Sequence, residues 1–94
     1  MAFYIEGLIA TSNEVIRIGE AASLDEAIAI AKSTIDEFLE REFKREMRSN
    51  ELFAKYRDSG VIPHIFRDDG ETLNVRTFNH LQYASAQCLK MCSR

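Results

Sequence analysis

Four imidazole and thiol side chains in the sequence could ligate zinc or iron: His64, His80, Cys88 and Cys92. The two cysteines stand at i and i+4, which places them on one face of a helix. His80 lies two such steps before Cys88, and a helical rise of about 12 Å separates them too widely for one ion. This spacing matches no zinc finger. We therefore expect small, buried cysteines rather than a metal site.

Nucleophilic catalysis by either cysteine is not favoured. A reactive thiol needs a lowered pKa, commonly from a helix N-terminus or a neighbouring cation, whereas both cysteines fall toward the C-terminal end of their predicted helix. The glycines are scattered singly, so no phosphate-binding loop is predicted. The acidic residues at 68, 69 and 71 lack the ligand count of an EF-hand loop. The sequence predicts no catalytic residue, metal or cofactor, and we lean toward a protein that is not an enzyme.

A basic stripe is the first candidate for an interaction surface. Its members recur at helical spacing: Arg41, Lys44, Arg45 and Arg48. Such a stripe can contact phosphates. However, Glu37 and Glu40 stand four residues before Arg41 and Lys44, as ordinary helix ion pairs do, and the net charge of −3 draws no polyanion to the chain. We interpret the stripe first as a solvated face, and keep nucleic acid or another polyanion as the alternative.

An aromatic and polar sheet face is the second candidate. If Ile65 points toward the helices, His64 and Phe66 point away from them, where Tyr4 and Arg76 can join them. Such a face could hold a small ligand in an enzymatic or binding pocket around Tyr4, His64 and Arg76, or meet a second subunit. If Phe66 points inward instead, His64 becomes a core residue. The strand is nearly symmetric in hydrophobicity, so both phases stay open.

The long helix that must position these groups is predicted over residues 23–47. Ser23 and Glu26 have the spacing of a capping box. An apolar face then follows at helical spacing: Leu24, Ala27, Ile28, Ala31, Ile35, Phe38 and Leu39. Past Leu39 this face drifts, so we expect the helix to bend or fray near Glu40, or to pack its last turns on another element. Phe43 and Met47 would then meet the next segment.

Two further helices are predicted. A short one begins at Ser49 or Asn50 as its cap and carries Leu52, Phe53 and Tyr56, with Gly60 in the C′ position that ends it. The last helix begins after Asn79, whose side chain can cap it with Gln82 in the third position.

Four strands are predicted around these helices. Residues 3–10 and 14–20 form a hairpin across a polar turn, with Ile16 and Ile18 inward. Residues 62–67 and 72–78 form another across an Asp-Gly turn, and Pro63 places the third strand at an edge or at its own margin. The chain reads as one α+β domain over residues 1–94, a two-layer sandwich of order ββα(α)ββα. Its four-stranded, mainly antiparallel sheet carries two main helices on one face plus one short helix.

A local resemblance accompanies this pattern. A strand, residues 22–27 and a helix are similar to the start of small HicB-type antitoxin domains. The resemblance covers less than half of the chain, and the three-strand beginning of that family is missing. No function or site residue is therefore carried over.

Composition bounds the partners and the compartment. A two-fold dimer is the simplest way for so small a domain to cover apolar residues, so we expect a homodimer or another protein partner, with no membrane partner. No apolar run approaches bilayer length, and the N-terminus lacks the basic region of a signal peptide. The two cysteines fit reduced thiols and a cytoplasmic setting. The sequence thus predicts a small interaction or regulatory domain.

Overall fold

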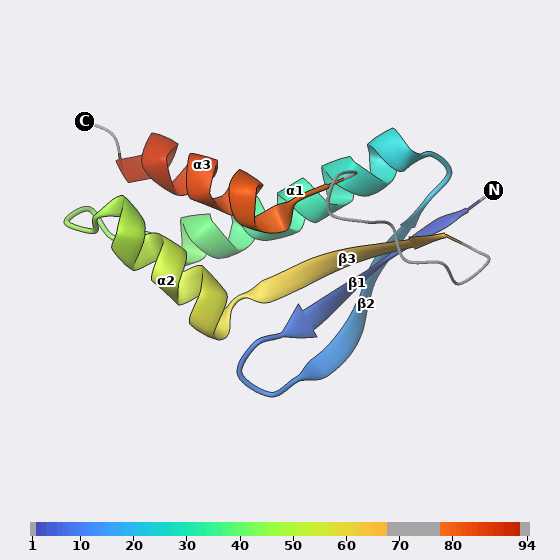
Figure 1. Cartoon of the computed structure of the whole chain (residues 1–94), viewed down its shortest axis with the longest axis horizontal. Helices are drawn as coiled ribbons and strands as arrows, with labels where there is room; N and C mark the ends of the chain where they lie inside the picture. The colour runs from blue at the N-terminus through green and yellow to red at the C-terminus, as the bar shows by residue number, and fades with distance from the viewer. Residues whose placement is uncertain (1, 68–77, 93–94) are drawn as a thin grey trace.

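The computed structural model describes residues 2–67 and 78–92. Within them the chain runs β1 (Phe3–Ile9), β2 (Glu14–Ala21), α1 (Leu24–Glu42), α2 (Ser49–Ser59), β3 (Val61–Arg67) and α3 (His80–Cys92). The strands form an antiparallel sheet of order β2-β1-β3. Figure 1 shows α1 passing along the sheet, with α2 and α3 gathered beyond one end of it. The predicted α+β class is confirmed.

The first hairpin forms as its turn chemistry predicts. Asn13 adopts a left-handed backbone conformation, with φ of 58°, which asparagine tolerates better than most residues. The Ser12 hydroxyl accepts a hydrogen bond from the amide of Glu14. The register shifts between Ile5 and Glu6 because β2 carries one extra residue there. Ile16, expected inward, is instead 43% exposed, since the hairpin tip projects past the helices (Figure 1).

The third strand has a settled orientation. Ile65 is buried and His64 is exposed, so the phase with Ile65 toward the helices is the correct one. Pro63 pairs with Gly7, and β3 is an edge strand within the described part of the chain, as the proline predicts. The Asp-Gly turn and residues 72–77 of the predicted fourth strand lie outside the described residues, so a four-stranded sheet is not confirmed.

The long helix begins where predicted and ends earlier. The amide of Glu26 donates to the Ser23 hydroxyl at 3.2 Å. The Glu26 carboxylate accepts from Ala22 at 3.3 Å, rather than from the expected amide of Ser23. The helix ends at Glu42, and Phe43 is its extended C-cap. The helix therefore ends near the predicted bend at Glu40, and the prediction of a helix to residue 47 was wrong.

The short helix is confirmed with two corrections at its ends. Its N-cap is Arg48, whose amide donates to the Glu51 carboxylate at 3.2 Å, and not Ser49 or Asn50. Gly60 is the C-cap with φ of −79°, so no left-handed ending forms. Glycine is needed there for another reason: a β-carbon would lie 2.9 Å from Cδ1 of Tyr56 and collide with that residue's backbone oxygen.

The last helix is capped as predicted, with the Asn79 side chain accepting from the amide of Gln82 at 3.1 Å. It packs on α1 and α2. By contrast, α1 contacts all three described strands. The predicted placement of both main helices on one face of the sheet is therefore not confirmed.

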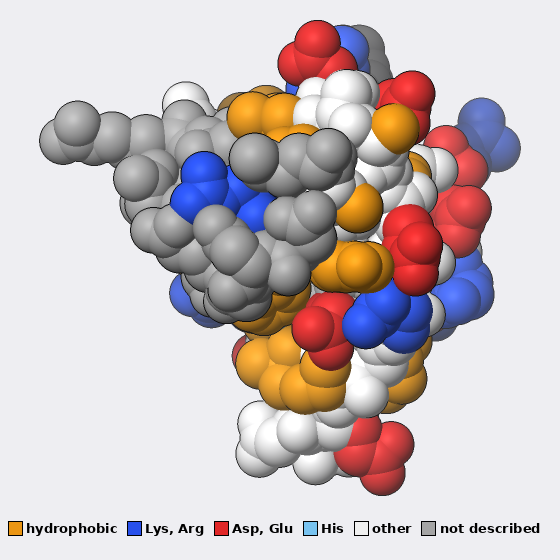
Figure 2. Space-filling view, turned by 90° about the vertical axis from the view of Figure 1, so that its right-hand side faces the viewer, with side chains coloured by type: hydrophobic (Ala, Val, Ile, Leu, Met, Phe, Trp, Pro, Cys, Tyr) orange, Lys and Arg blue, Asp and Glu red, His pale blue; other side chains and the backbone are white. Residues whose placement is uncertain are grey.

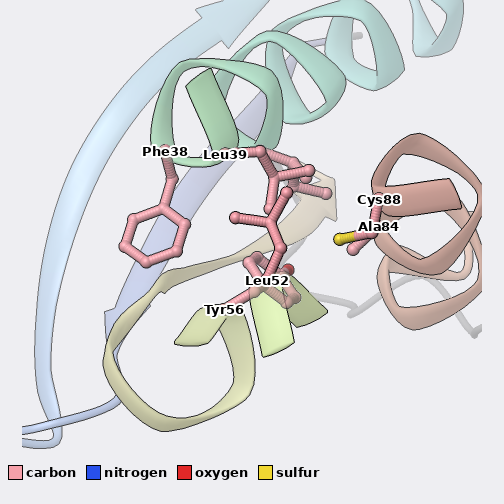
Figure 3. Packing of buried hydrophobic residues seen from close by; sticks show 7 residues of the cluster. Phe38, Leu39, Leu52, Tyr56, Ala84 and Cys88 are labelled. Atoms are coloured by element: carbon pink, nitrogen blue, oxygen red, sulfur yellow. The ribbon is translucent and has the colours of Figure 1, made fainter. Parts of the chain in front are cut away.

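Two separate hydrophobic clusters result. The sheet cluster joins small and branched side chains of the strands and the first half of α1: Ile5, Ala21, Ala27, Ala31 and Ile65. The helical cluster joins the second half of α1 to α2 and α3, and six of its members are labelled in Figure 3: Phe38, Leu39, Leu52, Tyr56, Ala84 and Cys88. Phe43 and Met47 pack against this second cluster, to which α2 contributes Leu52 and Tyr56.

Candidate functional site

The predicted basic stripe does not lie on one helix. Arg41 is in the last turn of α1, Lys44 and Arg45 are exposed in the connection that follows, and Arg48 is the N-cap of α2. Because α1 ends at Glu42, the helical spacing behind the stripe was the wrong premise. The four cations still share one short segment, which we call the basic connection (residues 41–48).

Acidic and aromatic groups lie close to the basic connection. The Arg41 guanidinium lies 5.5 Å from the ring centre of Phe38, and its Nε lies 4.0 Å from the Glu42 carboxylate. Lys55 approaches the same carboxylate at 3.7 Å. Exposed pairs of this kind contribute little to stability. Glu42 partly balances the charges of Arg41 and Lys55, and the other three cations of the basic connection are exposed.

The sheet face away from α1 carries the second predicted group. Tyr4 pairs with Phe66, and Glu6 pairs with His64, so these side chains share one face. The Arg17 guanidinium covers the Tyr4 ring at 4.7 Å. The structure thus brings Tyr4, His64 and Phe66 together. Arg76, the remaining residue of the predicted pocket, lies outside the described residues.

A tyrosine and two histidines form a connected group that the sequence did not predict. Tyr56 on α2 is fully buried, and its hydroxyl oxygen lies 2.9 Å from Nδ1 of His80 on α3. The His80 ring meets the His64 ring edge-on, with 6.3 Å between the ring centres. These residues come from three elements, so no local spacing could have indicated the contact.

Protonation in this group follows from its surroundings. Burial raises the pKa of the Tyr56 hydroxyl, which keeps its proton. Burial, and secondarily the charge of His64, lower the pKa of His80 below its ordinary value. A buried hydroxyl must donate to an acceptor, and Nδ1 of neutral His80 lies within reach. The arrangement is a hydrogen-bonded joint between α2 and α3 that favours uncharged partners.

A second polar contact ties α1 to α3. The Tyr83 hydroxyl lies 2.8 Å and 3.0 Å from the two carboxylate oxygens of Asp36, and Gln87 donates to the same carboxylate at 3.0 Å. Burial and the neighbouring Asp36 raise the pKa of Tyr83 to about 12. The Lys32 ammonium lies 5.3 Å from the Tyr83 ring centre. This group fixes the helices relative to each other.

The cysteines are placed as core residues rather than as reactive ones. Both thiols are free, with Cys88 buried and Cys92 half-buried. Burial, and secondarily Cys92, raise the pKa of Cys88 to about 11, which leaves the nucleophilic thiolate scarce at neutral pH. Among residues 2–67 and 78–92, no three His, Cys, Asp or Glu side chains gather to hold a metal ion.

Two shallow hollows in the described part of the chain are lined by none of the predicted site residues. One, of about 180 Å³, lies between α2 and α3 and is lined by Ser49, Asn50, Phe53, Ser85 and Leu89. The other, of about 300 Å³, is more open and is lined by Ala2, Glu20, Ala21, Ala22 and Glu26. Neither brings a nucleophile and a base together.

The first half of β2 is the most exposed part of the described sheet. Val15 is 59% exposed and its neighbour Ile16 is 43% exposed. Arg17 and Glu20 follow, with 3.4 Å between Nη1 and the carboxylate and with side chains 54% and 65% exposed. Figure 2 shows hydrophobic side chains gathered toward the hairpin end of the molecule, with charges of both signs above them. The strand thus offers apolar and paired charged groups side by side.

Comparisons of the chain with protein-family models, with curated proteins and with solved structures found no significant match. In the described part of the chain, no helix combines the length and apolar character that crossing a bilayer requires.

Proposed function

We propose that this chain is a non-catalytic interaction domain that works as a homodimer. The observation that carries the proposal is the adjacent exposure of Val15 and Ile16 on β2, which is an edge strand among the described strands. Isolated exposed apolar residues are common on monomers, but a pair on a strand edge also offers unpaired backbone groups. Two-fold interfaces are the commonest way for soluble proteins to cover such surfaces.

The chemistry of the buried groups supports a structural rather than a catalytic role. The raised pKa of Cys88 and the lowered pKa of His80 both follow mainly from burial. Each group also has a packing partner: Cys88 in the helical cluster and His80 against Tyr56. The free thiols fit the reducing cytoplasm that we propose as the setting.

Sedimentation velocity at low and at high micromolar concentration tests the proposal. We expect the sedimentation coefficient to rise from the monomer value toward the dimer value as concentration increases. A species that remains monomeric at high micromolar concentration would refute self-association as the function.

Binding of a polyanion through the basic connection is the second candidate. The observation in its favour is that Lys44, Arg45 and Arg48 are all exposed within one short connection. Neutralising these three residues to glutamine should abolish an electrophoretic shift of mixed nucleic acids at low salt, and moderate salt should weaken the shift in the unmodified chain. The absence of any shift at low salt would exclude this candidate.

A further inference from the structure

We infer that two copies pair through their β2 strands, antiparallel about a two-fold axis, with Arg17 of each copy opposite Glu20 of the other. This inference rests on the proposed homodimer and names its interface. It would extend the three described strands of each copy into one continuous sheet across the two copies.

The backbone of β2 is suited to such pairing. One side of the strand bonds β1, and no other described strand lies beside it in the order β2-β1-β3. The strand is eight residues long, and its first half is exposed. Free amides and carbonyls along an edge strand are a template for a second strand. The opposite edge, β3, carries Pro63, which lacks an amide.

The side chains select the register. Arg17 and Glu20 pair with Glu6 and Tyr4 of β1, so both lie on the sheet face away from α1. An axis between residues 18 and 19 places Arg17 opposite Glu20 twice, once on each side of the axis. It also brings Ile16 opposite Ala21 on the face toward α1. A register with Arg17 or Glu20 opposite its own copy would place like charges together, which is destabilising.

The bulge in β2 is compatible with this register. A bulge usually twists an edge strand away from new partners. Here the extra residue lies between Arg17 and Gly19, next to the two-fold axis. Ile18 of each copy then faces Gly19 of the other, so the two bulges lie symmetrically on either side of the axis. The segment from Arg17 to Glu20 has equal length in the two copies, and the register is kept.

Charge reversal tests this register. The variants are Arg17→Glu, Glu20→Arg and the double variant, each studied by sedimentation equilibrium. Each single change converts both cross-strand pairs into like-charge pairs, so the dimer dissociation constant should rise at least about tenfold. The double variant should return to within about threefold of the unmodified chain, because the opposite charges face each other again.

Two matched variants control for net charge. Lys90→Glu and Glu40→Arg make the same charge changes at exposed positions outside β2 and should leave the dissociation constant unchanged. Circular dichroism checks that every variant is folded. We expect folding to be retained because the side chains of Arg17 and Glu20 are highly exposed. As an independent measurement, hydrogen exchange of the β2 amides should slow as the concentration of the unmodified chain rises through the dissociation constant.

The outcomes separate this inference from the proposed function. If the chain dimerises but neither single charge reversal changes the dissociation constant, the interface lies elsewhere and the β2 pairing is overturned. Self-association would then still stand. A double variant that remains as weak as the singles would overturn the Arg17–Glu20 register. A chain that never dimerises would overturn both the inference and the proposed function.

Discussion

The two halves of α1 face different surroundings, and the residues on each half differ accordingly. Toward the sheet the helix buries Ala27 and Ala31, whereas toward α2 and α3 it buries Ile35, Phe38 and Leu39. Small side chains allow the helix backbone to approach the strands, whose own isoleucines fill the space between them. On the other half, large side chains of α1 pack among side chains of α2 and α3 (Figure 3).

The two clusters also differ in their polar contacts. The helical half contains Tyr56 bonded to His80, and Asp36 bonded to Tyr83 and Gln87. Each of these contacts joins two different helices, and buried polar contacts impose a specific geometry because an unsatisfied group is costly. On the sheet half, the fully buried residues of α1 are alanines, and its larger residues are only partly buried: Leu24, Ile28 and Ile30. On the helical half, large apolar side chains are buried and directional hydrogen bonds join the helices.

Truncation in the helical cluster should have the largest effect. Leu52 is fully buried among large neighbours, so Leu52→Ala should lower the free energy of unfolding by about 3 kcal/mol through lost burial and a residual cavity. Urea denaturation followed by circular dichroism measures the change. Leu89→Ala is the matched control, because Leu89 is 61% exposed and should change stability by less than about 0.5 kcal/mol. Equal effects of the two changes would contradict the assignment of the core.

Enlargement in the sheet cluster comes next in size and tests whether close packing matters there. Ala31 is fully buried, so Ala31→Leu should force α1 away from the strands and lower the free energy of unfolding by about 2 kcal/mol. Ala29 is on the exposed side of the same helix, and Ala29→Leu should be nearly neutral there because leucine is also a good helix former. A stabilised Ala31→Leu variant would show that the sheet cluster is loosely packed, which would contradict the contrast drawn between the two halves.

Local patterns predicted most of the elements. These patterns involve residues only a few positions apart, where short-range hydrogen bonding and periodicity determine structure. They include the caps at Ser23 and Asn79, the turn at Asn13 and the apolar face of α1. The end of α1 was harder to predict because residues 43–47 have reasonable helix propensity. In the structure, Phe43 and Met47 pack on the helical cluster without continuing the helix.

The candidate sites were less predictable because they depend on contacts between distant residues. The orientation of β3 was open in sequence and is settled by burial of Ile65 under α1. From the sequence, His80 was considered only as a possible metal ligand. Its hydrogen-bond partner Tyr56 lies 24 positions earlier, on another helix. The exposure of Ile16 depends on how far the hairpin extends beyond α1, which periodicity does not specify.

The smallest expected effect concerns the pH dependence of the helical half. His80 is the first residue of α3, where the helix dipole opposes a positive charge. It also contacts buried Tyr56 from α2 and lies against His64 from β3. Burial, and secondarily the charge of His64, lower the pKa of His80 in the folded chain. The unfolded chain therefore binds the proton first, and the contribution of neutral His80 to stability is present above about pH 6.5 and is lost as the pH falls through the lower folded value.

Replacement by asparagine isolates this contribution, because its side-chain oxygen can still accept from Tyr56 but does not titrate. Urea denaturation at pH 7.5 and pH 5.5, above most carboxylate titration, should show a larger loss of stability on acidification in the unmodified chain than in His80→Asn. The difference should be below about 1 kcal/mol because His80 is only partly buried. His64→Gln serves as the second comparison: it should reduce the acid sensitivity in part, since it removes the neighbouring charge while leaving the Tyr56 contact in place. An identical pH dependence in the unmodified chain and His80→Asn would show that the contact between α2 and α3 tolerates a charged imidazole. It would contradict the conclusion that the Tyr56–His80 hydrogen bond helps to position the helices.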